Sequence, residues 1–246
     1  MNFEESGKPV SINNGSTIGI LIIHGFTSTV SAMKYMIDGF NKVKYNIEAP
    51  RLSGHGSKWE DLNKVKYSDW ISDAENALIK LKGISKKVFV FGLSMGGTIS
   101  LYLAEKHKDI SGLILVNNAL IFKDPRLFFL PLLKLFVKST PAIAGDIKDP
   151  DETEVAYDKN PTGGLNELMK LIKLVKTNLY KIETPALIFK SEKDHVVPRE
   201  SAIWTYDNIS SKNKKFEWLT NSYHVATLDF DKDLIIKTSI EFIKEN

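Results

Sequence analysis

The chain has 246 residues, of which 43% are hydrophobic and 26% charged, and it contains no cysteine. This length suits one large α/β domain with a sizeable core, and the lack of cysteine excludes a disulfide framework, a thiolate nucleophile and a Cys-based zinc site. The 33 basic and 30 acidic residues are well mixed and leave a net charge of +3, so no basic patch typical of a nucleic-acid partner is present. We expect a cytoplasmic protein, because disulfides are rare in that compartment.

Hydrophobic runs of strand length alternate with amphipathic segments of helix length along most of the chain. The predicted order is strand 18–24, helix 32–40, strand 47–52, helix 68–81, strand 87–92, helix 96–107, strand 112–118, strand 185–191, strand 215–220 and helix 232–245. Several of these strands are nearly continuous Ile, Leu, Val and Phe, as in strands buried on both faces. The alternation predicts right-handed βαβ units around a mostly parallel central sheet with helices on both faces.

The alternation is interrupted once, between Asn118 and Pro185, where no strand is predicted. An insertion of this length is too long for a plain loop. We therefore expect a core formed by residues 1–118 and 180–246, and a small, mostly helical cap formed by residues 119–179. The most hydrophobic stretch, 119–138, is interrupted by Lys123, Asp124, Arg126, Pro131 and Lys134, so we expect no membrane-spanning helix there. The acidic, polar N-terminus MNFEESGKPV does not have the pattern of a signal peptide.

The stretch FGLSMGG, residues 91–97, places Ser94 in a Gly-X-Ser-X-Gly pattern between a predicted strand and a predicted helix. This context is typical of a nucleophile elbow, in which a sharp turn raises the serine above the sheet at the start of a helix. Gly92, Gly96 and Gly97 suit such a turn because a side chain would collide with the neighbouring backbone. The short pattern also recurs by chance, so a plain turn is the alternative role for Ser94.

A serine nucleophile needs a base, and in such a fold the acid and then the histidine follow the serine along the chain. Three histidines follow Ser94, but His107 ends a predicted helix, where we expect a structural role, so His195 and His224 remain as candidates. His195 directly follows Asp194, the first candidate acid, and is poorly placed to receive its hydrogen bond, so we predict His224 as the base. Asp194 ends the strand PALIFKS and its short extension, with Glu192 as the alternative acid.

A second acid, Asp229, follows His224, and we expect it to cap the final helix. An oxyanion hole needs two N–H donors, one from the residue after the nucleophile and one from a loop after an early strand. Met95 supplies the first, and Phe26, in the loop HGFT, is the candidate for the second.

With these residues, the chain resembles members of the α/β-hydrolase superfamily. More narrowly, it resembles the bacterial monoacylglycerol lipase and carboxylesterase group. The resemblance extends over nearly the whole chain through LIIHGFTST, PRLSGHG, GLSMGGTISLYLAEKH, DPDETEVAYDKNPT, PALIFKSEKDHVVP and NSYHVATLDFD. It implies an α/β-hydrolase fold whose cap is inserted after the sixth strand. It also implies the triad Ser94, Asp194 and His224, the oxyanion donors Phe26 and Met95, and no cofactor or metal.

In that group, a glutamate of the cap meets the glycerol hydroxyls, and the matching position is Glu154, for which a solvated surface charge is the alternative. Ile143 matches a cap residue that lines the glycerol pocket. The cap run RLFFLPLLKLFV is larger and more aromatic than the resemblance implies, so a transient contact of the cap with a membrane surface stays open.

The resulting hypothesis is a serine esterase that hydrolyses monoacylglycerols, and short- to medium-chain carboxylic esters, through an acyl-enzyme on Ser94. The alternatives are a carboxylesterase with another natural ester, a peptidase or carbon–carbon hydrolase on the same fold, and a non-enzymatic lipid-binding protein. The sequence does not predict an oligomeric state.

Overall fold

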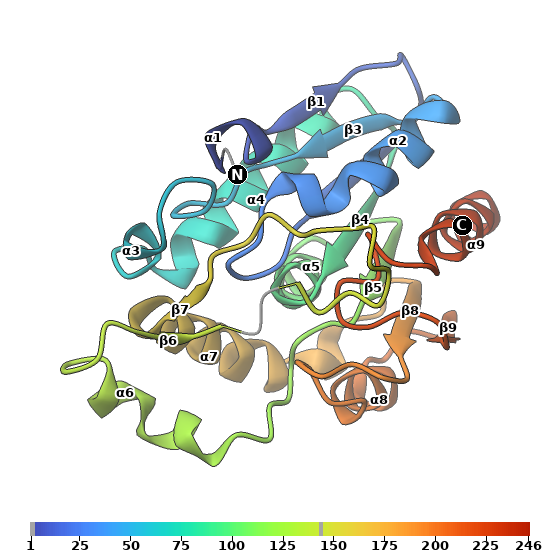
Figure 1. Ribbon diagram of the computed structural model, residues 1–246. Coiled ribbons are helices and arrows are strands. Elements are labelled where there is room, and N and C mark those ends of the chain that lie inside the picture. The colour runs from blue at the N-terminus through green and yellow to red at the C-terminus, as the bar shows by residue number, and fades with distance from the viewer. Residues whose placement is uncertain (1–2, 143–144) are drawn as a thin grey trace.

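The computed structural model describes residues 3–142 and 145–246. Seven strands form one sheet in the order β1-β3-β2-β4-β5-β8-β9, and only β1 is antiparallel to its neighbour (Figure 1). The strands are β1 Val10–Ile12, β2 Ile18–Ile23, β3 Asn46–Ala49, β4 Lys87–Leu93, β5 Gly112–Val116, β8 Ala186–Ser191 and β9 Lys214–Leu219. The predicted mostly parallel sheet is thus confirmed; β1 was not predicted because three residues are too few to establish a periodicity.

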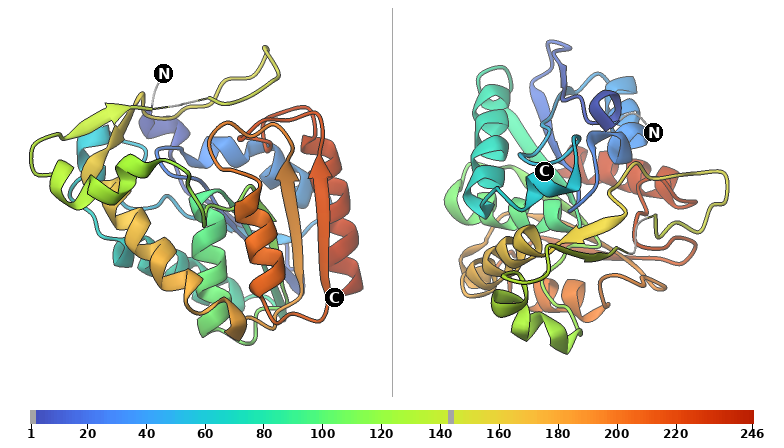
Figure 2. Two further views of the ribbon diagram at one scale, coloured as in Figure 1. Left: turned by 90° about the horizontal axis from the view of Figure 1, so that it is seen from below. Right: turned by 60° about the vertical axis from the view of Figure 1, so that its left-hand side comes forward.

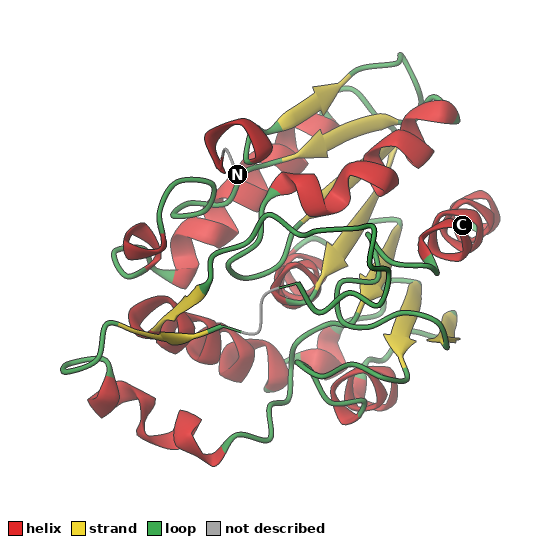
Figure 3. Cartoon of the chain, in the orientation of Figure 1, coloured by secondary structure: helices red, strands yellow, loops and turns green. Residues whose placement is uncertain are grey.

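Helices cover both faces of this sheet, as predicted (Figure 3). Alternate residues of the buried strands point to opposite faces, so Leu21 and Ile23 pack on one side while Ile20 and Ile22 pack on the other. The first side is covered by α4 Tyr67–Lys82, α5 Met95–Lys106 and α8 Glu200–Asn208, and the second by α2 Lys34–Lys42 and α9 Lys232–Glu245. Three shorter helical turns, α1 Phe3–Ser6, η1 Val30–Met33 and α3 Trp59–Leu62, lie in connections.

The long insertion between β5 and β8 crosses the carboxyl ends of the strands (Figure 2). It contains η2 Pro125–Phe129, α6 Leu130–Leu133, β6 Ser139–Pro141, β7 Lys159–Pro161, α7 Thr162–Lys176 and η3 Leu179–Lys181. We use the word cap for residues 119–179. The paired strands β6 and β7 correct the expectation of a segment without strands: each has three residues including a proline, which hides the alternation typical of a strand.

The cap follows the fifth strand in chain order rather than the sixth, because β1 is the only strand before β2 among the described residues. The parallel strands are aligned so that their carboxyl ends meet at one edge: Gly92 of β4 lies beside Ile23 of β2, and Leu93 lies beside Val116 of β5. In the described part of the chain, no helix is both long and apolar enough to cross a membrane.

Candidate active site

A cavity of about 880 Å³ lies between the carboxyl edge of the sheet and the cap. Four polar residues predicted for the site line this cavity: Ser94, Asp194, His224 and Glu154. Much of the remaining wall is hydrophobic and is formed by Phe26, Leu93, Phe122, Leu127, Leu130, Leu133, Pro141, Leu165, Leu168, Val196, Pro198 and Val225. The cavity can therefore bury an apolar ligand next to a small group of polar side chains.

Ser94 occupies a sharp turn between the last residue of β4 and the first residue of α5. Its backbone angles, φ 54° and ψ −116°, lie in a region that non-glycine residues rarely adopt. A Cβ on Gly92 would lie 2.4 Å from the Gly96 carbonyl, and one on Gly96 would lie 2.1 Å from the Ile23 oxygen. Only glycine fits at these two positions, as the sequence predicted for a nucleophile elbow.

The structure brings the three predicted triad residues into one hydrogen-bonded chain. His224 Nε2 lies 3.0 Å from Ser94 Oγ, and His224 Nδ1 lies 2.9 Å from Asp194 Oδ2. Ser94 is 9% and His224 7% exposed, and the side chain of Asp194 is 1% exposed. Because the carboxylate accepts from Nδ1, the neutral imidazole presents Nε2 as an acceptor to the serine hydroxyl.

The alternative base and the alternative acid do not join this hydrogen-bonded chain. His195 is exposed, and its Nδ1 bonds to Asp146 Oδ1 at 2.7 Å rather than to Asp194. Glu192 is also exposed, and its backbone N–H bonds to Leu219 O at 3.0 Å. Neither residue contacts the Ser94 hydroxyl.

Asp194 is held from three directions. Oδ1 accepts the N–H groups of Val196 at 2.9 Å and Val197 at 2.8 Å, while Oδ2 accepts His224 and the ammonium of Lys190. Burial favours a neutral carboxyl, but attraction by His224 and Lys190 and the hydrogen bonds from them outweigh it and hold the pKa of Asp194 well below its usual range. Asp194 is therefore ionised throughout the neutral range.

The two residues predicted as oxyanion donors, Met95 and Phe26, belong to segments that adjoin Ser94. Met95 is the first residue of α5, whose N–H has no partner within the helix. Phe26 follows Gly25, and a Cβ on Gly25 would lie 3.4 Å from Ser94 Cβ, so this loop passes close to the serine. No acceptor for either N–H is found in residues 3–142 or 145–246.

The Phe26 loop rests on a buried aromatic group that includes two histidines. Phe26 packs edge-on against His55 and Trp70, and His24 packs edge-on against His55. His24 Nδ1 donates to Gly25 O at 2.9 Å, and its Nε2 accepts the Leu52 N–H at 3.2 Å. Burial lowers the pKa of His24 to about 4, and burial together with the neighbouring His24 lowers the pKa of His55 well below its usual value. Both are neutral spacers beneath the loop.

Glu154 lines the cavity and is fixed at both oxygens. Oε1 accepts the Ser28 hydroxyl at 2.6 Å, and Oε2 accepts the Gly145 N–H at 3.1 Å. A freely solvated charge would not have these contacts. Ile143, the other predicted glycerol-pocket residue, lies outside the described residues.

The sequence reasoning missed three charged residues that support the site. Lys190 lies beneath Asp194. Asp146, from the cap, accepts the backbone N–H groups of both His195 and His224 at 3.1 Å. The only sequence signal for Lys190 was a lysine within a hydrophobic strand, and Asp146 gave none.

The third missed residue, Asp229, corrects a prediction. It does not cap the final helix, whose first turn is preceded by Asp231. Its buried carboxylate instead accepts the N–H groups of Lys148, Asp149, Tyr223 and Phe230 at 2.7–3.0 Å. Asp229 and Asp146 thus join the cap segment 145–149 to the loop that carries His224. In the described ranges, no cluster of three or more acidic, histidine or cysteine side chains could hold a metal ion.

Most of the chain is similar in sequence to known proteins. The family described as serine aminopeptidase, S33, matches residues 17–231. The thermostable monoacylglycerol lipase of Bacillus sp. (strain H-257) is 39% identical, with 97% of this chain and 95% of the relative covered. The carboxylesterase of Bacillus subtilis (strain 168) is 27% identical, with 97% and 96% covered.

A solved structure from work on LipS and LipT, two metagenome-derived lipolytic enzymes, superimposes with a TM-score of 0.95 at 35% identity, and 98% of each chain is covered. The monoacylglycerol lipase of Paleococcus ferrophilus has the same fold, with a TM-score of 0.80 at 16% identity over 97% of this chain and 99% of that one. The resemblance and the α/β-hydrolase fold predicted from the sequence are confirmed.

Proposed function

We propose that this chain, which belongs to the serine aminopeptidase S33 family, is a serine esterase. It hydrolyses monoacylglycerols to glycerol and fatty acid, and it also hydrolyses short- to medium-chain carboxylic esters. The observation that carries the proposal is the hydrogen-bonded chain from Ser94 through His224 to Asp194 in the wall of a largely hydrophobic cavity. The 39% identity to a monoacylglycerol lipase over nearly the full length supports the substrate class.

In the acylation step, Ser94 Oγ attacks the ester carbonyl carbon while His224 Nε2, 3.0 Å away, accepts the hydroxyl proton. Asp194 remains ionised and stabilises the imidazolium that forms. His224 then passes the proton to the alcohol oxygen as the bond to glycerol breaks. The acyl group is left as an ester on Ser94.

The negative charge that develops on the carbonyl oxygen needs donors placed before the reaction begins. The Met95 N–H at the start of α5 and the Phe26 N–H from the loop beside Ser94 are the donors that we assign. A donor of this kind typically accounts for a factor of about 10² to 10³ in turnover, because it is already oriented in a site with little water. The neutral His24 and His55 beneath the loop keep Phe26 in position without adding charge.

In the second step, water takes the place of the alcohol. His224 accepts a proton from this water, whose oxygen attacks the acyl carbon, and the same N–H groups bind the oxyanion. Collapse of the intermediate returns the proton to Ser94 Oγ and releases the fatty acid. Hydrolysis needs no group beyond the residues already named.

The hydrophobic wall of the cavity accounts for the acyl half of the substrate. Cap residues such as Leu130, Leu133 and Leu168 face core residues such as Val225 across it. Each buried methylene contributes about 0.8 kcal/mol, or roughly a fourfold gain in binding. Longer acyl chains should therefore bind more tightly until the cavity is filled.

Glu154 is the residue that we assign to the alcohol half. Its carboxylate is held by Ser28 and the Gly145 N–H, and each oxygen can accept a further hydrogen bond. Glycerol offers two free hydroxyl groups in a monoacylglycerol, whereas a simple alkyl ester offers none. This difference supports a preference for monoacylglycerols.

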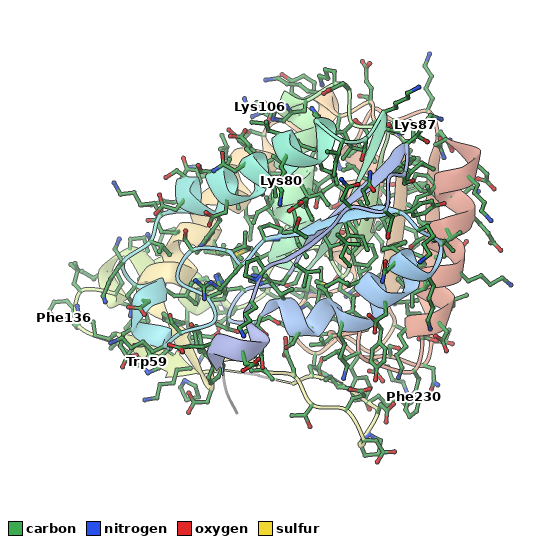
Figure 4. The ribbon with its side chains drawn as sticks, turned by 90° about the horizontal axis from the view of Figure 1, so that it is seen from above. Trp59, Lys80, Lys87, Lys106, Phe136 and Phe230 are labelled. Carbon is green, nitrogen blue, oxygen red and sulfur yellow. The ribbon has the colours of Figure 1, made fainter. Side chains whose placement is uncertain are left out.

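We also propose a transient contact between the cap and a membrane surface. Five large hydrophobic side chains of the segment 125–138 are exposed, namely Phe128, Phe129, Leu132, Leu135 and Phe136. Phe128 is 83% and Phe136 79% exposed, and Phe136 projects at the margin of the molecule in Figure 4. Lys134 and Lys138 lie in the same segment. A hydrophobic patch with flanking lysines suits a lipid surface, from which a water-insoluble substrate would be taken up.

Comparison of three substrates tests the proposal against the peptidase chemistry in the family's description. The purified chain should hydrolyse monolauroylglycerol and p-nitrophenyl butyrate but should release little product from alanine p-nitroanilide. The expected order follows from a cavity with a hydrophobic wall for an acyl chain. Faster release from the anilide than from both esters would contradict the proposal and favour an aminopeptidase.

A further inference from the structure

A lysine is buried directly below the Asp194 carboxylate. Lys190 belongs to β8, in which all six residues are buried, and its side chain is fully excluded from solvent. Lys190 points to the same face of the sheet as Ala186 and Ile188, and these two residues belong to the hydrophobic core on that face. An ammonium group is costly to bury unless it is paired and hydrogen-bonded, so its position needs a specific reason.

The Lys190 ammonium has three acceptors for its three hydrogens. It donates to Asp194 Oδ2, to Val197 O at 2.8 Å and to Asn117 Oδ1 at 3.2 Å. All three ammonium hydrogens therefore have a hydrogen-bond acceptor. One of these acceptors, Asp194 Oδ2, also accepts the hydrogen bond from His224 Nδ1.

Asn117 extends this arrangement to the histidine itself. Its amide Nδ2 donates to His224 O at 2.8 Å and to Ser191 Oγ at 2.9 Å, while its backbone has a positive φ of 48°. Lys190 is therefore linked indirectly to His224 by two hydrogen-bonded routes, one through the Asp194 carboxylate and one through the Asn117 amide.

The arrangement also has an electrostatic consequence. Lys190 and His224 donate to the same oxygen of Asp194, so a cation lies close to the imidazole that becomes positively charged during the reaction. Burial lowers the pKa of Lys190, and attraction by Asp194, Asp146 and Glu200 offsets part of that effect. The nearby His195 bonds through Nδ1 to Asp146 Oδ1 at 2.7 Å.

We propose that Lys190 is a positioning residue for the reaction at Ser94: it holds the Asp194 carboxylate against His224 and places a positive charge close to the imidazole. The inference rests on the proposed function. A lysine that served only the stability of β8 would affect folding and leave the pH dependence of the reaction unchanged.

The test compares Lys190→Met, which removes both charge and donors, with Lys190→Gln, which removes the charge but keeps amide donors. The readouts are kcat/KM for p-nitrophenyl butyrate and the rate of covalent labelling of Ser94 by a fluorophosphonate, each from pH 5 to 9. Lys193→Met is the matched control, because Lys193 is exposed three residues away and does not line the cavity. Circular dichroism and thermal unfolding report folding.

We expect both Lys190 variants to move the acid limb of both profiles upward by about one pH unit, because a repelling charge is lost. The plateau rate should fall by about tenfold to a hundredfold in Lys190→Met and by less in Lys190→Gln, because misplacement of a reacting group is costly. The control should match the wild type.

Unchanged profiles in folded Lys190 variants would overturn the inference alone, and so would failure of both variants to fold, since the lysine would then serve the fold. A wild-type chain that does not label at Ser94 would contradict both the inference and the proposed function.

Discussion

Glu154 is the side chain that separates hydrolysis of monoacylglycerols from hydrolysis of any ester of similar size. It lines the cavity, and Ser28 and Gly145 fix its orientation. Replacement by glutamine keeps the size of the side chain but replaces a charged acceptor with a neutral one. The free energy of a hydrogen bond to the substrate then becomes about 1 kcal/mol less favourable.

We therefore expect Glu154→Gln to lower kcat/KM for monolauroylglycerol by about fivefold to tenfold and to leave p-nitrophenyl butyrate within about twofold. The ratio of the two rates, measured on the same preparation, checks this. Glu152→Gln is a matched control, since Glu152 bonds to Lys34 and Tyr35 and does not line the cavity. An unchanged ratio in Glu154→Gln would mean that this residue has a structural role only.

Single residues differ in how far the sequence could predict them. Ser94 was predictable because glycines enforce its turn locally, and His224 and Asp194 followed from chain order. Lys190 and Asp146 were not, because contacts that form only in the folded chain define their roles: Lys190 also donates to Asn117, 73 residues away, and Asp146 accepts a backbone N–H 78 residues away. Asp229 was misassigned because its nearness to a helix start suggested a cap.

The cap is the element on which the proposed substrate class depends most. Its segment 145–149 is joined to the His224 loop by Asp146 and Asp229, whereas its segment 125–138 carries exposed hydrophobic side chains. One part of the cap is thus attached firmly to the site, and another part faces solvent.

At this scale, we expect Phe128→Ser combined with Phe136→Ser to weaken binding to phosphatidylglycerol vesicles by about tenfold for each residue, because each ring loses its burial in lipid. Turnover of soluble p-nitrophenyl acetate should not change, since neither residue lines the cavity. Ile79→Ser, a change at a similarly exposed side chain of α4, is the control. Vesicle co-sedimentation measures binding; equal binding by the double variant and the wild type would rule out this contact.

Most strands of the core were predictable because buried parallel strands are continuous hydrophobic runs, whereas the edge strand β1 and the helix α8 were not predicted. The pair β6 and β7 was not, because three-residue strands containing proline have no readable period. The exposure of Phe128, Phe129 and Phe136 was not predictable either, since the same hydrophobic run could lie on the underside of a cap or on its outer surface.

The stability of the whole molecule should depend on pH through its buried histidines. His24 has its pKa lowered to about 4 by burial, whereas an unfolded chain binds a proton near pH 6.5. The folded state therefore favours the neutral ring, and its stability is full above about pH 6.5 and is lost as the pH falls toward 4. His24 alone should remove about 3 kcal/mol of unfolding free energy over this range, and His55 acts in the same direction.

Urea unfolding at several pH values between 4 and 8 measures this dependence, and His24→Asn provides the comparison. The variant should be less stable at neutral pH, but its stability should fall less steeply below pH 6.5. Parallel curves for the variant and the wild type would show that His24 is not the source of the dependence.

Turnover of p-nitrophenyl butyrate by folded Ser94→Ala tests whether Ser94 is the nucleophile. We expect kcat to fall by at least about 10³-fold, because His224 and the oxyanion donors cannot form an acyl-enzyme without the hydroxyl. Thermal unfolding within a few degrees of the wild type would establish that the variant is folded. Activity within about tenfold of the wild type in that folded variant would contradict the claim.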